Sequence, residues 1–120
     1  MAGVGISVYA IENSEPEVRD CLRVGHAAAL PWENDRFDFI YSINTLHNLD
    51  VYDLKRAIWE TERVGRNGKW LCVESYRSER EKVNLLYWQR TCMNFYNMEK
   101  SKWLLRESCY AGEIGFVVFE

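Results

Sequence analysis

Long apolar runs and an excess of basic charge are two features that this sequence of 120 residues lacks. A helix that crosses a bilayer needs about 20 consecutive apolar residues, and no stretch of the chain approaches that length. The first residues, MAGVGISVYAIENSEPE, have neither the basic end nor the apolar centre of a secretory signal. We therefore expect no membrane partner and a cytoplasmic location.

Basic residues are outnumbered by acidic ones, because the chain has 15 Lys and Arg and 18 Asp and Glu, which gives a net charge of -3. Proteins that bind nucleic acids usually carry a basic patch, so we expect no nucleic-acid partner. The four cysteines show neither C-x-x-C spacing nor clustered histidines, which argues against a zinc site. We expect no metal, reduced thiols and no disulfide.

The composition that remains is that of an ordinary globular protein. Hydrophobic residues make up 48% of the chain and charged residues 28%, which is far from the composition of disordered proteins. A chain of this length buries one modest core. We expect residues 1–120 to form a single domain.

The stretch from Val24 to Leu49 is the most informative part of the sequence. Residues 37–43 form a nearly continuous apolar run that stops at Asn44. A strand that is apolar on both faces must be covered on both faces, which favours a parallel sheet with helices above and below. Ligands of such sheets bind at the carboxyl ends of the strands. We therefore look for chemistry at two strand ends, His26-Ala27 and residues 44–47.

Local patterns predict the other helices and strands. Ser14 with Glu17 is typical of a capping box, and Asn67-Gly68 is typical of a left-handed helix exit. Residues 112–115 read as a turn, followed by a closing strand in an antiparallel hairpin with a short strand near Tyr110. The predicted strands are 3–8, 23–25, 37–43, 69–75 and 116–119, and the predicted helices are 9–13, 14–22, 53–64, 79–93 and 97–109.

The chain carries the pattern G-x-A-x-x-L-P-[FW]-x-x-x-x-F-D-x-[IV]-x-S-x-x-x-L-H-x-L, followed by a helix ending in E-x-x-R-V and a new strand. This pattern of residue types and spacings resembles that of the class I S-adenosylmethionine-dependent methyltransferases. The resemblance implies a Rossmann-like α/β fold, S-adenosylmethionine as cofactor and methyl transfer to an acceptor. The matching residues are Gly25, Ala27, Leu30, Pro31, Trp32, Phe37, Asp38, Ile40, Ser42, Leu46, His47, Leu49, Glu60, Arg63 and Val64.

Two parts of the family pattern have no match in this chain. A first central strand with its D-x-G-x-G-x-G loop would precede the residues present, so we expect an amino-terminally truncated domain. Gly5 stands where the family usually has an acid that binds the ribose. Without the central strand two strand edges stay unpaired, and unpaired edges invite association. We therefore expect either a homodimer that forms through these edges or an altered strand pairing that closes the gap.

The resemblance also implies roles for five residues. His26 would accept a hydrogen bond from the adenine amino group, or is simply a surface histidine, and Ala27 would contact the adenine ring through its backbone. Asn44 and Leu46 would lie beside the methionine part of the cofactor. His47 has a pKa suited to a general base, although we favour structural packing or capping as the role of this histidine.

The methyl acceptor does not follow from these patterns. The segment from Glu74 to Cys92 combines polar and aromatic residues in the way that an acceptor pocket requires. We expect a small-molecule or saccharide-type acceptor there, while a solvated helix with an aromatic core face is the alternative for this segment. The alternative for the whole chain is a non-catalytic Rossmann-like module that acts in oligomerisation or protein interaction.

Overall fold

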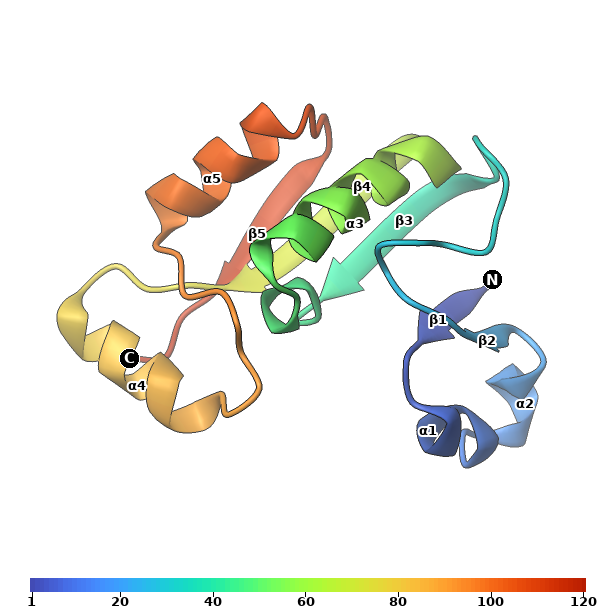
Figure 1. Cartoon of the computed structure of the whole chain (residues 1–120), viewed down its shortest axis with the longest axis horizontal. Coiled ribbons are helices and arrows are strands. Elements are labelled where there is room, and N and C mark those ends of the chain that lie inside the picture. The colour runs from blue at the N-terminus through green and yellow to red at the C-terminus, as the bar shows by residue number, and fades with distance from the viewer.

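The structure is a computed structural model that describes residues 1–120 (Figure 1). None of its helices is both long and apolar enough to cross a membrane. The strands are β1 (Gly3–Gly5), β2 (Leu22–Val24), β3 (Phe37–Ile43), β4 (Gly65–Glu74) and β5 (Glu113–Val117). The helices are α1 (Val8–Glu12), α2 (Pro16–Arg19), α3 (Val51–Val64), α4 (Glu79–Trp88) and α5 (Met98–Glu107), and one 3-10 turn, η1 (Leu46–Asn48), precedes α3.

The strands form two separate parallel sheets. Strands β1 and β2 pair with each other, and β3, β4 and β5 form a second sheet in that order. The smaller sheet, with α1 and α2, lies beside β3 and is connected to it by residues 25–36 (Figure 1). Each sheet therefore ends in an unpaired edge where the other begins, at β1 and at β3.

Helix α3 forms because its sequence presents apolar residues at spacings of three and four. Its first turn is capped by Asp50, whose carboxylate accepts a hydrogen bond from the amide of Asp53 at 2.8 Å. This cap supplies a partner for one of the amides that a helix start leaves free. The helical periodicity of residues 53–64 is confirmed, and the buried positions are Leu54, Ala57, Ile58, Thr61 and Val64.

The core lies between one face of the larger sheet and two helices. Ile58 of α3 and Leu71 of β4 are fully buried, and Leu104 and Leu105 of α5 join the same cluster. Helices α3 and α5 therefore cover the same face of the sheet (Figure 1). The α/β class with parallel strands is confirmed, whereas the expected cover on both faces of β3 is wrong. On the uncovered face Phe39, Tyr41 and Ile43 stay exposed.

The predicted antiparallel hairpin at the carboxyl terminus is also wrong. Strand β5 pairs with β4 in parallel, with Leu71 opposite Ile114 and Val73 opposite Phe116. The supposed turn at 112–115 lies mostly inside this strand. Helix α5 is the reason, because it carries the chain back to the start of the sheet and the next strand then enters in the parallel direction.

Three local predictions are wrong. Ser14 does not cap α2, because its hydroxyl donates to the carbonyl of Ile11 and Glu15 takes the N-cap position. Asn67-Gly68 is part of β4, since the chain passes from α3 directly into this strand. Helix α4 stops at Trp88, five residues before the predicted end at residue 93. The predicted cap of α5 by Asn97 is confirmed.

Candidate active site at the strand ends

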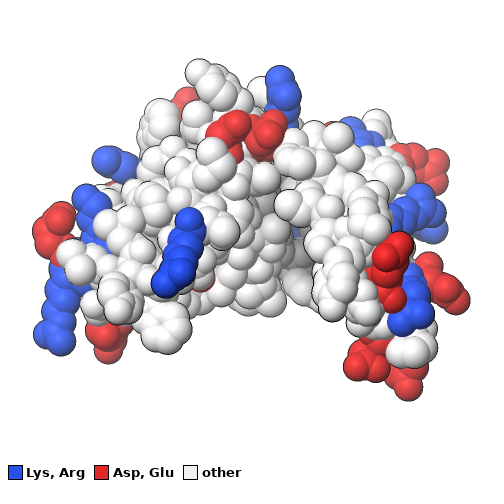
Figure 2. Space-filling model, turned by 60° about the horizontal axis from the view of Figure 1, so that its bottom comes forward, with Lys and Arg blue, Asp and Glu red and all other residues white.

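The carboxyl ends of β3, β4 and β5 point to one side of the molecule (Figure 1). Figure 2 turns this side forward and shows most charged side chains at the two ends, with a largely uncharged middle.

Asn44 is the first residue after β3 and has a left-handed backbone with a φ of 51°. Asn tolerates this conformation better than most residues do, and here the amide of Asn44 donates to the carbonyl of Cys72 at 2.9 Å. The side-chain oxygen of Asn44 is buried and has no hydrogen-bond partner. It is therefore an acceptor that lacks a donor, at the point where a parallel sheet usually binds its ligand.

His47 lies in η1 and faces the last residue of β4. The imidazole Nε2 is 3.6 Å from Oε2 of Glu74, and Oε1 of Glu74 accepts a hydrogen bond from the side-chain amide of Gln89 at 2.7 Å. Both side chains of the pair are almost fully buried. His47 Nδ1 and Glu74 Oε2 have no hydrogen-bond partner within the chain. Each side chain of this pair therefore has one polar atom that is free to bind a ligand or a water molecule.

Burial lowers the pKa of His47 below its usual 6.5, although the Glu74 carboxyl raises it in part. The imidazole is therefore neutral at pH 7, with one nitrogen protonated and the other free to accept. A neutral imidazole is the form that accepts a proton or a hydrogen bond. The pair consequently suits either a buried structural contact or a proton acceptor.

The backbone of His47 holds the segment that follows α4. Its carbonyl accepts hydrogen bonds from the amides of Met93 at 2.8 Å and Asn94 at 3.1 Å, and the side-chain amide of Asn94 donates to the carbonyl of Leu49. The cavity beneath this segment has a volume of about 40 Å³. It holds two or three waters at most and is too small for an organic cofactor. Its lining includes Leu46, His47, Leu54, Ile58, Glu74, Asn94 and Tyr96.

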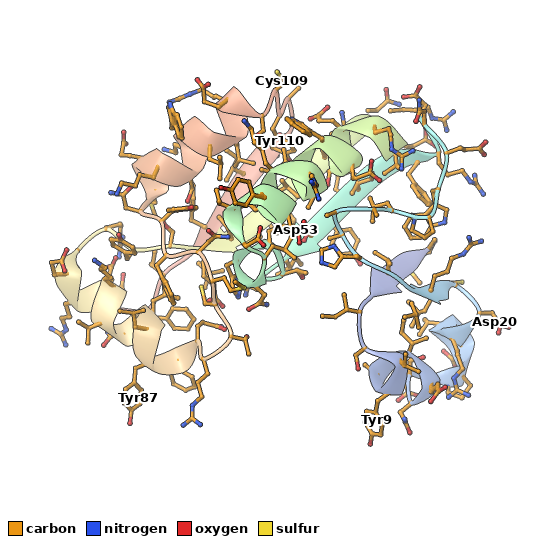
Figure 3. All side chains as sticks on the ribbon, viewed as in Figure 1. Tyr9, Asp20, Asp53, Tyr87, Cys109 and Tyr110 are labelled. Atoms are coloured by element: carbon orange, nitrogen blue, oxygen red, sulfur yellow. The ribbon has the colours of Figure 1, made fainter.

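The second predicted strand end, at His26 and Ala27, lies against the first turn of α3. His26 Nδ1 accepts a hydrogen bond from the amide of Ala28 at 3.0 Å, and Nε2 is 3.9 Å from Oδ2 of Asp53. In the neutral ring Nε2 therefore carries the hydrogen, and at 3.9 Å it is too far from Asp53 to form a hydrogen bond. Figure 3 shows Asp53 in the middle of the molecule, on the side that faces the smaller sheet.

Hydrogen bonds from an ion pair on α3 hold the connection between the two sheets against this helix. Arg63 donates to the carboxylate of Glu60 and to the carbonyls of Leu30 and Trp32, while Glu60 accepts from the amide of Leu30. The hydrogen bonds from Arg63 lower the pKa of Glu60 below its usual 4.5. These contacts determine where the chain after Ala27 runs. They explain the E-x-x-R-V pattern as a structural tie rather than a ligand contact.

The structure brings the predicted residues together in two adjoining groups. Asn44 and His47 follow β3, whereas His26 lies beside Asp53. Ala27 packs against the core cluster to which Leu46 also belongs. The sequence places Glu74 and Gln89 in the segment expected to hold the acceptor, without a specific role for either. Nothing in the sequence places Gln89 against Glu74.

The comparison with protein families decides which fold this is. The model of a methyltransferase domain matches residues 1–73. The chain belongs to the methyltransferase domain family. The methyltransferase family expected from the sequence is thereby confirmed, and this methyltransferase domain shares its fold with two solved structures.

The first of these is the YcgJ protein of Bacillus subtilis, with a TM-score of 0.70 and 18% identity over 89% of this chain and 50% of that one. The second is an S-adenosylmethionine-dependent methyltransferase, possibly a histamine N-methyltransferase, of Thermotoga maritima. It has a TM-score of 0.65 and 24% identity over 88% of this chain and 53% of that one. At these identities the likeness shows the fold alone, and the chain spans about half the length of each structure.

A curated protein also matches part of the methyltransferase domain. It is named tRNA pseudouridine synthase B, from Ligilactobacillus salivarius, and is 34% identical over 76 residues. The match covers 62% of this chain and 24% of that protein. Because three quarters of that protein lie outside the match, its name does not define the function of this chain.

The residues present fit only part of S-adenosylmethionine, the cofactor that the family implies. The unpartnered oxygen of Asn44 and the exposed donor of His26 supply polar contacts near the strand ends. The carboxyl end of β1 supplies no carboxylate, because Gly5 ends the strand and Ser7 caps α1 through its hydroxyl. The fit is therefore better near β3 and α3 than near β1.

Proposed function

We propose that the chain binds S-adenosylmethionine and takes part in methyl transfer to a small-molecule or saccharide-type acceptor. The observation that carries this proposal is the buried, unpartnered oxygen of Asn44 at the carboxyl end of β3 in a methyltransferase domain. The cofactor supplies a methyl group on a sulfonium, and the transfer depends mainly on alignment of the reacting atoms. The protein's contribution is then to bind and orient.

Four residues would hold the cofactor in this proposal. Asn44 and Leu46 lie on the methionine side, and His26 and Ala27 lie on the adenine side. Because Nε2 of His26 is a donor, its expected partner is a ring nitrogen of adenine rather than the amino group. Ala27 contributes its backbone, so its side chain only has to be small.

The affinity should be lower than that of a site with a ribose carboxylate. A hydrogen bond to a charged group contributes about 1.5 to 3 kcal/mol, which corresponds to about one to two powers of ten in Kd. Since Gly5 leaves that position without a carboxylate, we expect a Kd about ten to a hundred times above that of a site with the acid.

The acceptor is proposed to lie next to α4. This helix carries Tyr87 and Trp88, which are 86% and 71% exposed, and the ring of Trp88 stacks on Phe119 with centroids 6.3 Å apart. Exposed aromatic faces favour flat rings and sugars, which gain apolar contact there. Figure 3 shows Tyr87 on α4 and Tyr9 on α1. The end of α4 lies beside the strand ends of the larger sheet, because Gln89, which follows this helix, donates to Glu74 at the end of β4.

His47 has two possible tasks within this proposal. Its burial and its two backbone bonds to residues 93 and 94 favour a positioning role for the segment after α4. Its neutral imidazole would also serve as a general base that takes a proton from a hydroxyl or amine of the methyl substrate, if the cavity opens to that substrate. A pH profile of His47→Gln separates the two, because only loss of a base removes the acid limb of that profile.

Calorimetric titration with S-adenosylhomocysteine tests the proposal. This product analogue needs no acceptor, so an unidentified substrate does not hinder the measurement. We expect one site per chain and a loss of about tenfold in affinity for Asn44→Ala. Asn67→Ala is the matched control, because Asn67 lies near the opposite end of β4 and is exposed. Equal affinities for the two variants would remove Asn44 from the site.

The second candidate is a non-catalytic module of the same fold. It is favoured by the split between β1 and β3 and by the missing carboxylate at β1. No heat with millimolar S-adenosylhomocysteine, for a chain shown to be folded by circular dichroism, would favour this candidate. Binding with one site per chain would exclude it.

A further inference from the structure

Glu74 carries a buried negative charge that no cation of the chain neutralises. Its side chain is 2% exposed, and none of the ion pairs in the chain joins it to a Lys or Arg. Burial lowers the pKa of His47, so the neighbouring imidazole is neutral at pH 7 and brings no charge either. Buried charges in proteins are normally paired. The partner that Glu74 lacks is therefore a cation.

One oxygen of the Glu74 carboxylate is held in place and the other is free. Oε1 accepts a hydrogen bond from the side-chain amide of Gln89 at 2.7 Å. Oε2 has no hydrogen-bond partner, because the nearest group, Nε2 of His47, is 3.6 Å away and thus beyond hydrogen-bond distance. A free carboxylate oxygen only accepts hydrogen bonds. The missing cation should consequently be one that donates a hydrogen bond.

The position of Glu74 is the one at which a parallel sheet binds its ligand. Glu74 is the last residue of β4. Asn44 follows the neighbouring strand β3, and its amide donates to the carbonyl of Cys72, two residues before Glu74. The side-chain oxygen of Asn44 is a second buried acceptor without a donor. Both neighbouring strand ends thus offer acceptors to a ligand.

The cavity of about 40 Å³ is lined by Glu74 and His47 together. Its volume is that of two or three waters, which suits an ammonium group with one or two carbon atoms. Much of the other lining is apolar, including Leu46, Leu54 and Ile58, and this suits a methylene next to the charge. A calcium ion would need about six to eight oxygen ligands, whereas this lining holds one carboxylate. An organic cation is therefore the better match.

We propose that Glu74 binds a primary ammonium group at the carboxyl ends of β3 and β4. The ammonium supplies the positive charge that Glu74 lacks, and one of its three N–H groups donates to Oε2. Gln89 is a positioning residue, because it fixes the carboxylate through Oε1. The rest of a larger ligand would extend from the cavity past residues 89–97, which form no helix or strand.

The ammonium has two possible sources, and the choice between them rests on the proposed function. The methionine part of S-adenosylmethionine carries one, and Asn44 is proposed to lie beside that part. A methyl acceptor that is a primary amine carries the other, and Gln89 follows α4, where the acceptor is proposed to bind. The ammonium site itself does not depend on methyl transfer.

Titration with methylammonium, followed by carbon-13 spectra of the glutamate carboxyl groups, tests the proposal. Methylammonium has two non-hydrogen atoms, so its Kd should be about 5 to 50 mM. We expect a saturable shift of the Glu74 carboxyl signal. Methanol, which is of similar size but uncharged, should leave this signal in place.

Glu74→Gln should weaken the binding of methylammonium at least about tenfold, as measured by the shift of the His47 amide. Glu113→Gln is the matched control and should bind as the unmodified chain does. Glu113 is exposed and opens β5 at the opposite end of the sheet, since it lies opposite Trp70 while Glu74 lies opposite Val117.

S-adenosylhomocysteine, which carries the methionine ammonium, identifies the source. The cofactor is the source if S-adenosylhomocysteine displaces methylammonium and binds Glu74→Gln about tenfold more weakly. The acceptor is the source, and is an amine, if S-adenosylhomocysteine binds both chains equally and methylammonium still binds beside it. A chain that binds methylammonium at Glu74 but no S-adenosylhomocysteine retains the ammonium site and contradicts the proposed function alone.

Two outcomes would overturn the ammonium site. The first is a Glu74 carboxyl signal that does not move at about 200 mM methylammonium. The second is the same methylammonium affinity for Glu74→Gln and Glu113→Gln, which places the binding at another carboxylate. If Glu74→Gln fails to fold, the unmodified chain decides, because the Glu74 carboxyl and the His47 amide must then shift with one common Kd.

Discussion

The tie between α3 and the connection of the two sheets predicts a large effect of Arg63→Met. Arg63 donates to Glu60 at 2.7 Å, to the carbonyl of Trp32 at 2.7 Å and to that of Leu30 at 3.1 Å. Methionine keeps much of the side-chain volume and removes every one of these donors. Two carbonyls and a carboxylate then lose their partners together.

The magnitude follows from the number of bonds and from their exposure. Each hydrogen bond to a charged group contributes about 1.5 to 3 kcal/mol, and these contributions are not additive. The side chains of Arg63 and Glu60 are 31% and 19% exposed, so water replaces some of the lost bonds. We expect a loss of about 2 to 3 kcal/mol in the free energy of unfolding, and a melting temperature lower by roughly 8 to 15 °C.

Thermal unfolding followed by circular dichroism measures this effect. Arg56→Met is the matched control, because Arg56 lies on the same helix, is 66% exposed and pairs with Asp53 at 3.6 Å. Exposed pairs of this kind contribute at most about 1 kcal/mol. If Arg63→Met melts within about 2 °C of Arg56→Met, the tie is not a stabilising contact and the reasoning fails.

The same tie predicts a pH dependence with a defined sign. The hydrogen bonds from Arg63 lower the pKa of folded Glu60, so the ionised carboxylate stabilises the folded state. This stabilisation is complete above the ordinary glutamate pKa of about 4.3 and is lost as the pH falls through the lowered pKa of the folded state. The difference in melting temperature between the unmodified chain and Arg63→Met should therefore shrink in strong acid.

Three further predictions concern stability. Ile58→Ala should cost about 3 to 4 kcal/mol in denaturant unfolding, because Ile58 is fully buried; a cost below about 1 kcal/mol would contradict the assigned core. Cys109→Gly should stabilise the fold by about 0.5 to 1 kcal/mol, since Cys109 has a φ of 58° after α5. Burial raises the pKa of Tyr110 to about 12, so the neutral phenol favours folding and this stability is lost above pH 10, which melts of Tyr110→Phe at pH 9 and 11 would reveal.

Much of the larger sheet could be predicted from the sequence. The apolar run of β3 and the periodicity of α3 are local signals, and both elements form within two residues of the predicted ends. The strand ends at Asn44 and His47 follow from these two elements. The residues expected near the cofactor could therefore be selected without a structure.

The remaining features depend on contacts between distant residues. The direction of β5 is determined by the path of α5, so a pattern that suits a hairpin near Tyr110 gave the wrong pairing. The Asn67-Gly68 pair suits a helix exit, but pairing with β3 draws it into β4. The exposure of Tyr41 depends on what covers the sheet rather than on its strand pattern, and the approach of Gln89 to Glu74 depends on where α4 packs.

The central claim is that this methyltransferase domain binds its cofactor at the carboxyl ends of β2 and β3. Two-dimensional amide spectra of the isotopically labelled chain, recorded during a titration with S-adenosylhomocysteine, test this claim most directly. The account predicts saturable shifts of the amides of His26, Ala27, Asn44 and Leu46, with no shift at Asn67. Shifts confined to other parts of the chain, or none at millimolar ligand, would contradict it.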